Sequence, residues 1–167
     1  MAPAPKIWDP LRRKTVALTP EERVRQWLIG VLHDGAGVPL HQMMSEVELR
    51  FGASEKVWRA DVLIYGRGGA PLAVAECKRP EVTLTPAVLE QALRYNCVLD
   101  VRCILITNGA ETRIFVRHSA GEETPDQVGG DAVATADATA TVMAGSDRPS
   151  GWRGADHLLT YEEMLSL

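Results

Sequence analysis

Two acidic residues and a lysine have the types and spacing that hydrolysis of a phosphodiester bond requires. Glu76 follows Asp61 by fifteen positions, and Lys78 follows Glu76 by two. Carboxylate oxygens are hard ligands that suit Mg²⁺. A divalent cation lowers the pKa of an attacking water and takes up charge on a phosphate, and a nearby ammonium can hold or polarise that water. We therefore predict Asp61 and Glu76 as metal ligands, and Asp61, Glu76 and Lys78 as catalytic residues, with Mg²⁺ as the cofactor and Mn²⁺ as its substitute.

A β-hairpin is expected to bring the two acids together. The runs 57–65 and 71–78 are rich in strand-forming residues, and Gly66-Arg67-Gly68-Gly69 joins them. A turn centred in this glycine-rich segment places Asp61 directly opposite Glu76. The pleat of the strands then puts both side chains on one face of the hairpin.

Two interpretations of this face are open. The first is an edge hairpin whose charged face lies in water, as acids on strands commonly do. The second is a half-buried face, because strand periodicity adds Leu63 and Val74 to it. Two half-buried carboxylates about 5 Å apart repel by roughly 3 kcal/mol at an effective dielectric of ~20, and a divalent cation between them would remove that repulsion. Cys77 faces the opposite side and is expected in the core.

The first predicted helix offers a further acid. It begins at Thr19-Pro20 and runs to about His33. Thr19 is the expected N-cap, with Glu22 completing a capping box and pointing away from the apolar stripe. Glu21 falls on the side of the apolar stripe. It is therefore our candidate for an additional carboxylate near the metal.

The second predicted helix begins at Thr85-Pro86 and runs to about Leu99. Gln91 and Tyr95 lie four positions apart and hence on one face of it. We take both as supporting residues of the site. The alternative is that Tyr95 packs in the core and Gln91 is an ordinary surface residue.

The remaining pattern predicts an α/β fold, a central mixed β-sheet flanked by helices. Three further strands are expected, at residues 46–51, 101–106 and 112–117. Residues 1–117 form the predicted core. Residues 118–150, poor in large apolar side chains, are predicted to be a flexible low-complexity insertion, with a weak edge strand at 139–143. Residues 151–167 are expected to close the same domain, with a short helix at 158–167.

Composition limits the classes of function. A chain of 167 residues, 46% hydrophobic and 24% charged, suits one globular domain, and it has no apolar run of the ~18 residues needed to cross a bilayer. Three cysteines without CxxC spacing suit a reduced cytoplasm. Residues 1–117 carry 16 Lys and Arg against 13 Asp and Glu, a mildly basic balance within a net charge of −4. This balance permits contact with nucleic acid without indicating it.

The spacing of Asp61, Glu76 and Lys78 resembles the PD-(D/E)xK nuclease superfamily, with Ala60-Asp61 in place of the Pro-Asp pair. A closer resemblance, over about residues 7–115, is to the N-terminal nuclease domain of the type I restriction enzyme R subunit (HsdR N-terminal-like). Five ordered blocks carry it: Trp8-Asp9-Pro10-Leu11-Arg12, Leu18-Thr19-Pro20-Glu21-Glu22-Arg23-Val24-Arg25-Gln26, Val74-Ala75-Glu76-Cys77-Lys78-Arg79-Pro80, Gln91-Ala92-Leu93-Arg94-Tyr95-Asn96 and Ile106-Thr107-Asn108-Gly109. The resemblance implies a restriction-endonuclease-like fold and metal-dependent DNA cleavage. It also implies that Gln91 and Tyr95 form a QxxxY motif that positions the DNA or the lysine.

We therefore expect a metal-dependent endonuclease domain that hydrolyses DNA, with a role in restriction, defence or DNA repair. One alternative is a weakly active or inactive nucleic-acid-binding or scaffold module of the same fold. Another is an RNase, or a defence effector switched on by a partner or small ligand. Cleavage of both strands would suit a homodimer.

Overall fold

The computed structural model describes residues 3–50, 52–53, 57–118 and 151–167. The predicted insertion at 118–150 and its weak strand at 139–143 therefore lie outside the described residues, apart from His118. Within the described residues no helix is long and apolar enough to cross a membrane.

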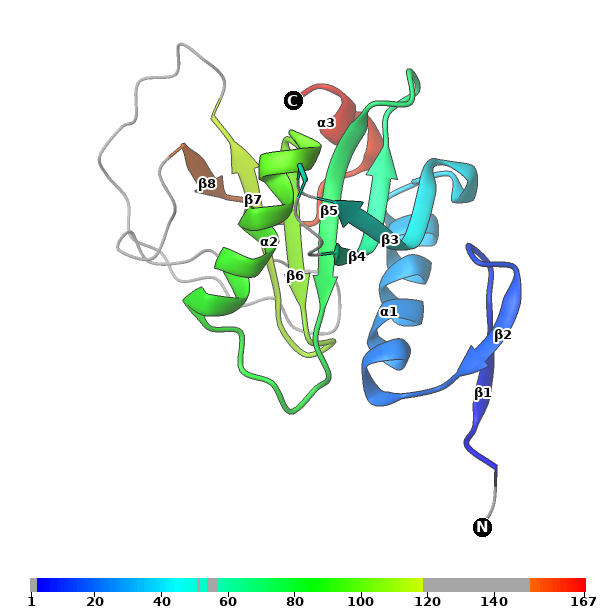
Figure 1. Cartoon of the computed structure of the whole chain (residues 1–167). Helices are drawn as coiled ribbons and strands as arrows, with labels where there is room; N and C mark the ends of the chain where they lie inside the picture. Colours follow the sequence, from blue (N-terminus) through cyan, green and yellow to red (C-terminus); the bar gives the residue numbers. More distant parts are fainter. Residues whose placement is uncertain (1–2, 51, 54–56, 119–150) are drawn as a thin grey trace.

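A six-stranded mixed sheet forms the centre of the fold (Figure 1). Its strands lie side by side in chain order: β3 (Met43–Arg50), β4 (Val57–Tyr65), β5 (Pro71–Cys77), β6 (Cys103–Thr107), β7 (Thr112–Arg117) and β8 (Trp152–Gly154). β5 and β6 are parallel, and every other neighbouring pair is antiparallel. The prediction of an α/β fold with a mixed sheet is confirmed. Because β3 and β6 flank the β4–β5 hairpin, the edge-hairpin interpretation is wrong.

Helices cover both faces of this sheet (Figure 1). On one face, α1 (Pro20–Gly30) and α3 (Tyr161–Leu165) pack against strand residues such as Val62 and Ala75. On the other, α2 (Pro86–Leu99) packs against strand residues that include Leu63. The two faces therefore bury two separate hydrophobic clusters, with the sheet between them.

Both long helices begin as the sequence predicts. The Thr19 hydroxyl accepts a hydrogen bond from the backbone N–H of Glu22 at 3.1 Å, and proline occupies the first turn of α1 and of α2. α1 continues into a π-helical turn, η1 (Val31–Gly35), and a 3₁₀ turn, η2 (Leu40–Gln42), precedes β3. At its far end α2 stops at Asp100, whose φ of 52° places it in the left-handed region.

The middle of the β4–β5 ladder has the register that the sequence predicts, but beside the turn Tyr65 pairs with Pro71 and the register shifts between Ile64 and Tyr65. Val62 pairs with Ala75 and Leu63 with Val74, which places Asp61 opposite Glu76 at the next position. On the other side of β4, the ladder with β3 is interrupted at Glu46, whose φ is 55°. Glu46 is the residue of β3 that would face Asp61 if the ladder were regular.

A second, two-stranded sheet stands at the N-terminal end of the chain (Figure 1). It consists of β1 (Lys6–Asp9) and β2 (Lys14–Ala17), antiparallel strands that the sequence analysis did not predict. Their charged composition lacks the apolar alternation of a buried strand. The turn is held by the buried Asp9, whose carboxylate accepts hydrogen bonds from the backbone N–H groups of Leu11 at 2.7 Å and Arg12 at 3.0 Å.

The C-terminal helix is shorter than the predicted 158–167. Thr160 caps α3 with a complete capping box, in which the side chain of Glu163 reaches back to the backbone N–H of Thr160 at 2.7 Å. The backbone N–H of Tyr161 donates to the carbonyl of Ala36 at 2.7 Å, and the hydroxyl of Tyr161 donates to the carbonyl of Tyr65 at 2.9 Å. These bonds hold the end of the chain against the α1 side of the sheet.

Candidate active site

Glu76 and Lys78 join α2 in one hydrogen-bonded cluster. Lys78 Nζ donates to Glu76 Oε1 at 2.7 Å and to Gln91 Oε1 at 3.1 Å. Gln91 Nε2 donates to Glu76 Oε1 at 2.9 Å and to the Tyr95 hydroxyl at 3.2 Å, and that hydroxyl donates to the carbonyl of Arg59 at 3.1 Å. The structure thus brings together Glu76, Lys78, Gln91 and Tyr95. Tyr95 also belongs to the buried hydrophobic cluster between α2 and the sheet. It therefore both packs in the core and contacts the site.

Glu76 is a buried carboxylate with one oxygen unused. Only 3% of the residue is exposed, and burial together with the neighbouring Asp61 raises its pKa to about 7. Oε1 takes the bonds from Lys78 and Gln91, whereas Oε2 is buried without a hydrogen-bond partner among the described residues. A buried polar atom without a partner costs free energy, so such atoms are uncommon in folded proteins.

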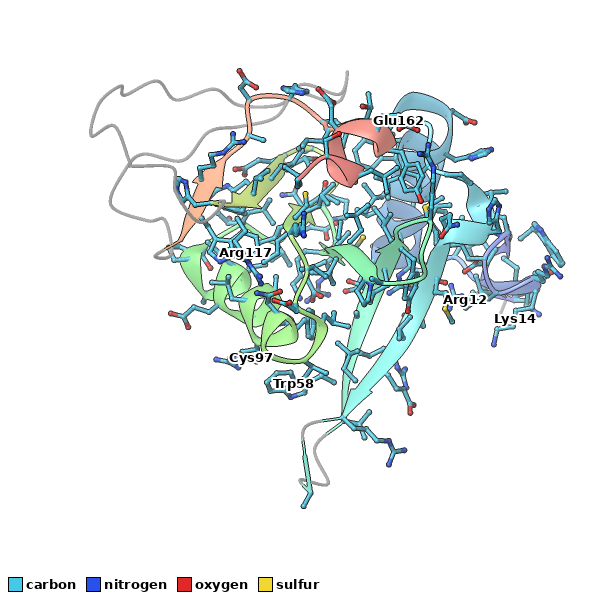
Figure 2. The ribbon with its side chains drawn as sticks, turned by 90° about the horizontal axis from the view of Figure 1, so that it is seen from above. Arg12, Lys14, Trp58, Cys97, Arg117 and Glu162 are labelled. Carbon is cyan, nitrogen blue, oxygen red and sulfur yellow. The ribbon has the colours of Figure 1, made fainter. Side chains whose placement is uncertain are left out.

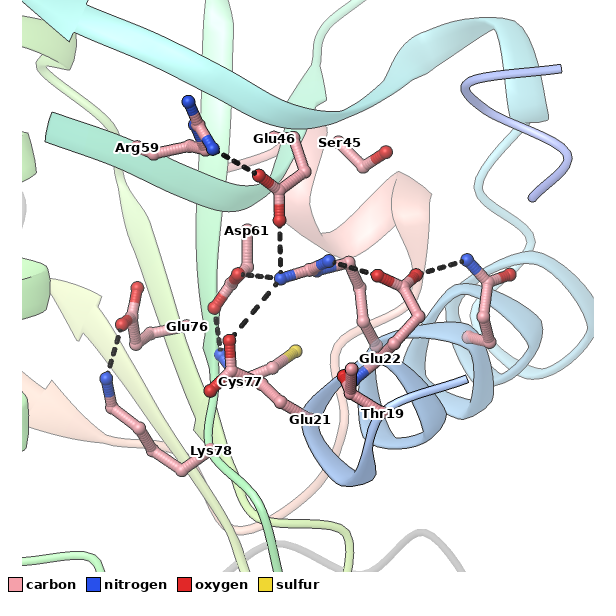
Figure 3. A network of polar contacts seen from close by, with 12 residues as sticks. Thr19, Glu21, Glu22, Ser45, Glu46, Arg59, Asp61, Glu76, Cys77 and Lys78 are labelled. Atoms are coloured by element: carbon pink, nitrogen blue, oxygen red, sulfur yellow. Dashed lines mark hydrogen bonds and ion pairs between the residues drawn. The ribbon is translucent and has the colours of Figure 1, made fainter. Parts of the chain in front are cut away.

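Asp61 faces a different set of partners (Figure 3). Its Oδ1 accepts from Arg25 Nη2 at 2.5 Å, and its Oδ2 accepts from the backbone N–H of Cys77 at 2.6 Å. Burial raises the pKa of Asp61 above its usual value, although Arg25 opposes that shift. The Cys77 side chain is fully buried on the α1 side of the sheet, as predicted.

The two acids are therefore not the uncompensated pair that the sequence suggested. Their opposed positions on β4 and β5 agree with the prediction, and the charge of Asp61 raises the pKa of Glu76. However, Asp61 pairs with Arg25 of α1, and Glu76 pairs with Lys78. The physical reason is that a charge buried in the sheet needs a nearby opposite charge, which α1 supplies to Asp61 and Lys78, the residue after β5, supplies to Glu76.

Arg25 is the centre of a buried ion-pair network that the sequence analysis missed. Its Nη1 contacts Glu22 Oε2 at 2.6 Å, and its Nη2 contacts Asp61 at 2.5 Å, Glu46 Oε1 at 2.7 Å and Glu21 Oε1 at 3.6 Å. Burial opposes the charge of Arg25, but the carboxylates, Asp61 first, hold its pKa above the usual value. Glu21, with a half-exposed side chain, thus reaches the edge of the network that holds Asp61. Its predicted role as an additional ligand stays a prediction.

The predicted capping role of the Glu22 side chain is wrong. Glu22 is buried, and its carboxylate contacts Arg12 Nη2 at 2.5 Å, Arg25 Nη1 at 2.6 Å and Gln26 Nε2 at 2.9 Å (Figure 3). Only its backbone N–H takes part in the cap, as donor to Thr19. Two arginines offer the carboxylate charge-assisted bonds, which are stronger than a bond to one backbone N–H.

Sequence signals for this network exist but are weak. Arg25 follows Glu21 and Glu22 by four and three positions, a common spacing of surface ion pairs on helices. Its contact with Asp61 spans 36 positions of sequence, and the left-handed backbone at Glu46 follows no residue preference. The sequence therefore gives no reason to place Arg25 or Glu46 beside Asp61.

Replacing Arg25 with methionine is expected to destabilise the protein by about 3–5 kcal/mol, because it leaves several carboxylates, Asp61 among them, without their shared cation. Urea unfolding at pH 7 measures the change. The matched control is Arg67→Met, which removes an exposed ion pair with Glu162 and should cost less than about 1 kcal/mol. Equal losses in the two variants would contradict the assignment of Arg25 as the centre of the network.

The stability of the protein should fall as the pH rises from 4.5 to 7 in EDTA. The pKa of Glu76 is about 7 in the folded protein against an ordinary value of 4.5, so the folded state keeps a proton that the unfolded state has lost. The stabilisation is complete below pH 4.5 and lost above about pH 7, and amounts to roughly 3 kcal/mol. Urea unfolding across this range should show a smaller fall in Glu76→Gln. Identical pH profiles would show that Glu76 ionises normally.

The donor set suits a divalent cation bound mainly by two carboxylates and water. The described residues contain no group of three or more His, Cys, Asp or Glu side chains placed to hold a metal ion by themselves. Mg²⁺ commonly keeps several waters and takes only one or two protein carboxylates. The unpartnered Oε2 of Glu76, beside Asp61, is the feature of this site that fits such an ion.

One solved structure supports the fold. The structure is similar to the fragment structure of a candidate HsdR subunit of a type I restriction enzyme from Vibrio vulnificus YJ016, with a TM-score of 0.54 and 19% identity over 89% of this chain. The chain spans 25% of that protein. A candidate nuclease of the DUF820 group from Anabaena variabilis ATCC 29413 gives a TM-score of 0.43 and 12% identity, covering 99% of this chain and 93% of that one.

The sequence comparison is more specific. No curated protein matches the chain. Residues 20–126, well over half of the 167 residues, match the family described as "Type I restriction enzyme R protein N terminus (HSDR_N)". This range includes every candidate site residue from Glu21 to Tyr95. The chain therefore belongs to the family of type I restriction enzyme R protein N termini.

Proposed function

We propose that this chain is a nuclease domain that hydrolyses phosphodiester bonds of DNA with the help of Mg²⁺, for which Mn²⁺ can substitute. Asp61 and Glu76 would hold the cation, and Lys78 would act on the attacking water or the phosphate. The proposal rests on the membership of the restriction enzyme family and on the arrangement of these three residues.

The buried Oε2 of Glu76 is the observation that carries the proposal. Glu76 is only 3% exposed, and its Oε2 has no hydrogen-bond donor within the part of the chain that the structure describes. Burial and Asp61 raise the pKa of Glu76 to about 7 although Lys78 opposes that shift, so a further positive charge here would favour the ionised carboxylate. A divalent cation beside this oxygen would supply that charge.

Each residue of the site then has a distinct task. A bound divalent cation lowers the pKa of an attacking water and neutralises charge on the scissile phosphate. The ammonium of Lys78 has three N–H donors, of which two bond Glu76 and Gln91. The third can donate to a phosphate oxygen or to water, since the side chain is 19% exposed. Gln91, fixed by Tyr95, holds Lys78 beside Glu76.

Incubation of the purified chain with supercoiled plasmid and Mg²⁺, with and without EDTA, tests the proposal. We expect nicked or linear DNA with Mg²⁺ or Mn²⁺ and intact DNA with EDTA. Parallel reactions with single-stranded DNA, duplex DNA and RNA separate a DNase from an RNase. Binding to these nucleic acids without cleavage under any condition would instead indicate a binding module of the same fold.

A further inference from the structure

The N-terminal hairpin carries exposed positive charge on a protein that is otherwise acidic. The hairpin and its turn hold four bases, Lys6, Arg12, Arg13 and Lys14, against one acid, Asp9. The other residues of the chain contain 14 Lys and Arg against 21 Asp and Glu. Asp9 is fully buried and pairs with Arg12, so the charges that the hairpin presents to solvent are all positive.

One face of the hairpin also presents a tryptophan. Trp8 is 58% exposed, the highest value among the large hydrophobic residues that the structure describes. It lies across from Thr15 and two positions from Lys6, both exposed, whereas Ile7 and Asp9 alternate with it and are covered. The hairpin thus offers solvent an aromatic ring with Lys6 on its own face and Arg13 at the turn, whereas Lys14, paired with Asp9, lies on the opposite face.

The hairpin is fixed to the candidate active site by ion pairs. Arg12 joins the carboxylate of Asp9 to Glu22 of α1, with 2.5 Å between Arg12 Nη2 and Glu22 Oε1. Glu22 contacts Arg25, which contacts Asp61. Figure 2 shows the hairpin at one side of the molecule, with Lys14 and Arg12 on it. The exposed face therefore has a set position relative to Asp61.

We propose that this hairpin binds a DNA strand, with an unpaired base stacked on Trp8, phosphates against Lys6 and Arg13, and Lys14 adding electrostatic attraction from the opposite face. Exposed cations on the hairpin match phosphates locally, and aromatic rings stack on bases of any sequence. The inference rests on the proposed function, because it assigns the surface that guides the substrate of that site. A base must be unpaired to reach the ring, so single-stranded or splayed DNA is the preferred form.

Fluorescence anisotropy with a labelled oligonucleotide in EDTA tests the charge contribution without cleavage. The test variant combines Lys6→Gln, Arg13→Gln and Lys14→Gln. The control combines Arg67→Gln, Arg102→Gln and Arg153→Gln, exposed bases outside the hairpin that give the same change in net charge. We expect the hairpin variant to bind about tenfold or more weakly at about 50 mM salt. The slope of its log affinity against log salt concentration should correspond to about two fewer phosphate contacts. Equal weakening in both variants would overturn the proposal.

Trp8→Ala tests the stacking contribution, with Met44→Ala, which removes another exposed apolar side chain, as its control. Trp8→Ala should weaken single-stranded DNA binding by about 5- to 100-fold and affect duplex DNA much less. Unchanged single-strand affinity would overturn the stacked base, and absence of DNA binding by the unmodified chain would overturn the whole proposal.

These measurements are independent of catalysis. Hairpin-dependent binding without any metal-dependent cleavage would support this inference and overturn the proposed function. Metal-dependent cleavage by a chain whose DNA affinity does not change with the hairpin substitutions would support the proposed function and overturn this inference.

Discussion

Glu76→Gln is expected to lower metal-dependent cleavage about a thousandfold or more and to abolish detectable Mn²⁺ binding. The amide has nearly the same shape as the carboxylate and can still accept a hydrogen bond from Lys78, but it has no charge with which to hold a cation. Loss of metal chemistry removes several kcal/mol of stabilisation of the transition state. Calorimetric Mn²⁺ titration and plasmid cleavage measure the two effects.

The matched control for Glu76→Gln is Glu81→Gln, an exposed acid five positions further along the chain. It makes the same chemical change outside the hydrogen-bonded cluster, so both metal binding and cleavage should be retained. If Glu76→Gln bound Mn²⁺ as the unmodified chain does, the metal would have to lie elsewhere. Urea unfolding in EDTA verifies that the variant is folded, since removing the buried charge should not destabilise it above pH 7.

Lys78→Ala is expected to keep the metal and lose the rate. The ammonium is a donor to water or phosphate and cannot be a metal ligand, so Mn²⁺ affinity should change little while cleavage falls by about 10²- to 10⁴-fold. Lys78→Arg should not restore the rate, because the planar guanidinium is larger and does not act as a compact donor. Single-turnover cleavage with saturating metal measures the chemical step.

Arg79→Ala is the matched control for Lys78→Ala, since it removes an exposed base at the next position. Its effect on the cleavage rate should be small and should shrink as the salt concentration rises, because this substitution changes only the long-range electrostatic attraction of the protein for DNA. Wild-type turnover by Lys78→Arg would count against a specific role for the ammonium.

The parts of the site that could be predicted from sequence are those fixed by local geometry. A glycine-rich turn joins β4 and β5, and after a register shift between Ile64 and Tyr65 the ladder places Asp61 opposite Glu76. The helical repeat places Gln91 and Tyr95 on one face of α2, where the structure shows them bonded to each other. In both cases the contact depends on residues within one hairpin or one helix.

The parts that were missed depend on contacts between distant segments. Arg25 gains its role only when α1 packs on the sheet beside Asp61, and a helical Glu–Arg spacing by itself predicts a solvated surface pair. The β1–β2 hairpin is short and charged, so it has no buried alternation to reveal it. Its turn depends on the burial of Asp9, and no local pattern of residues predicts that this aspartate is buried.

The left-handed backbone at Glu46 links the charge arrangement of the site to the stability of the protein. Glutamate seldom adopts a φ of 55°, and a residue other than glycine held there costs of order 1–3 kcal/mol. A glycine at position 46 would relieve that cost, but it would remove the carboxylate that contacts Arg25 beside Asp61. Glu46 therefore couples a strained backbone to a charge contact beside Asp61, and a glycine there would give up the contact together with the strain.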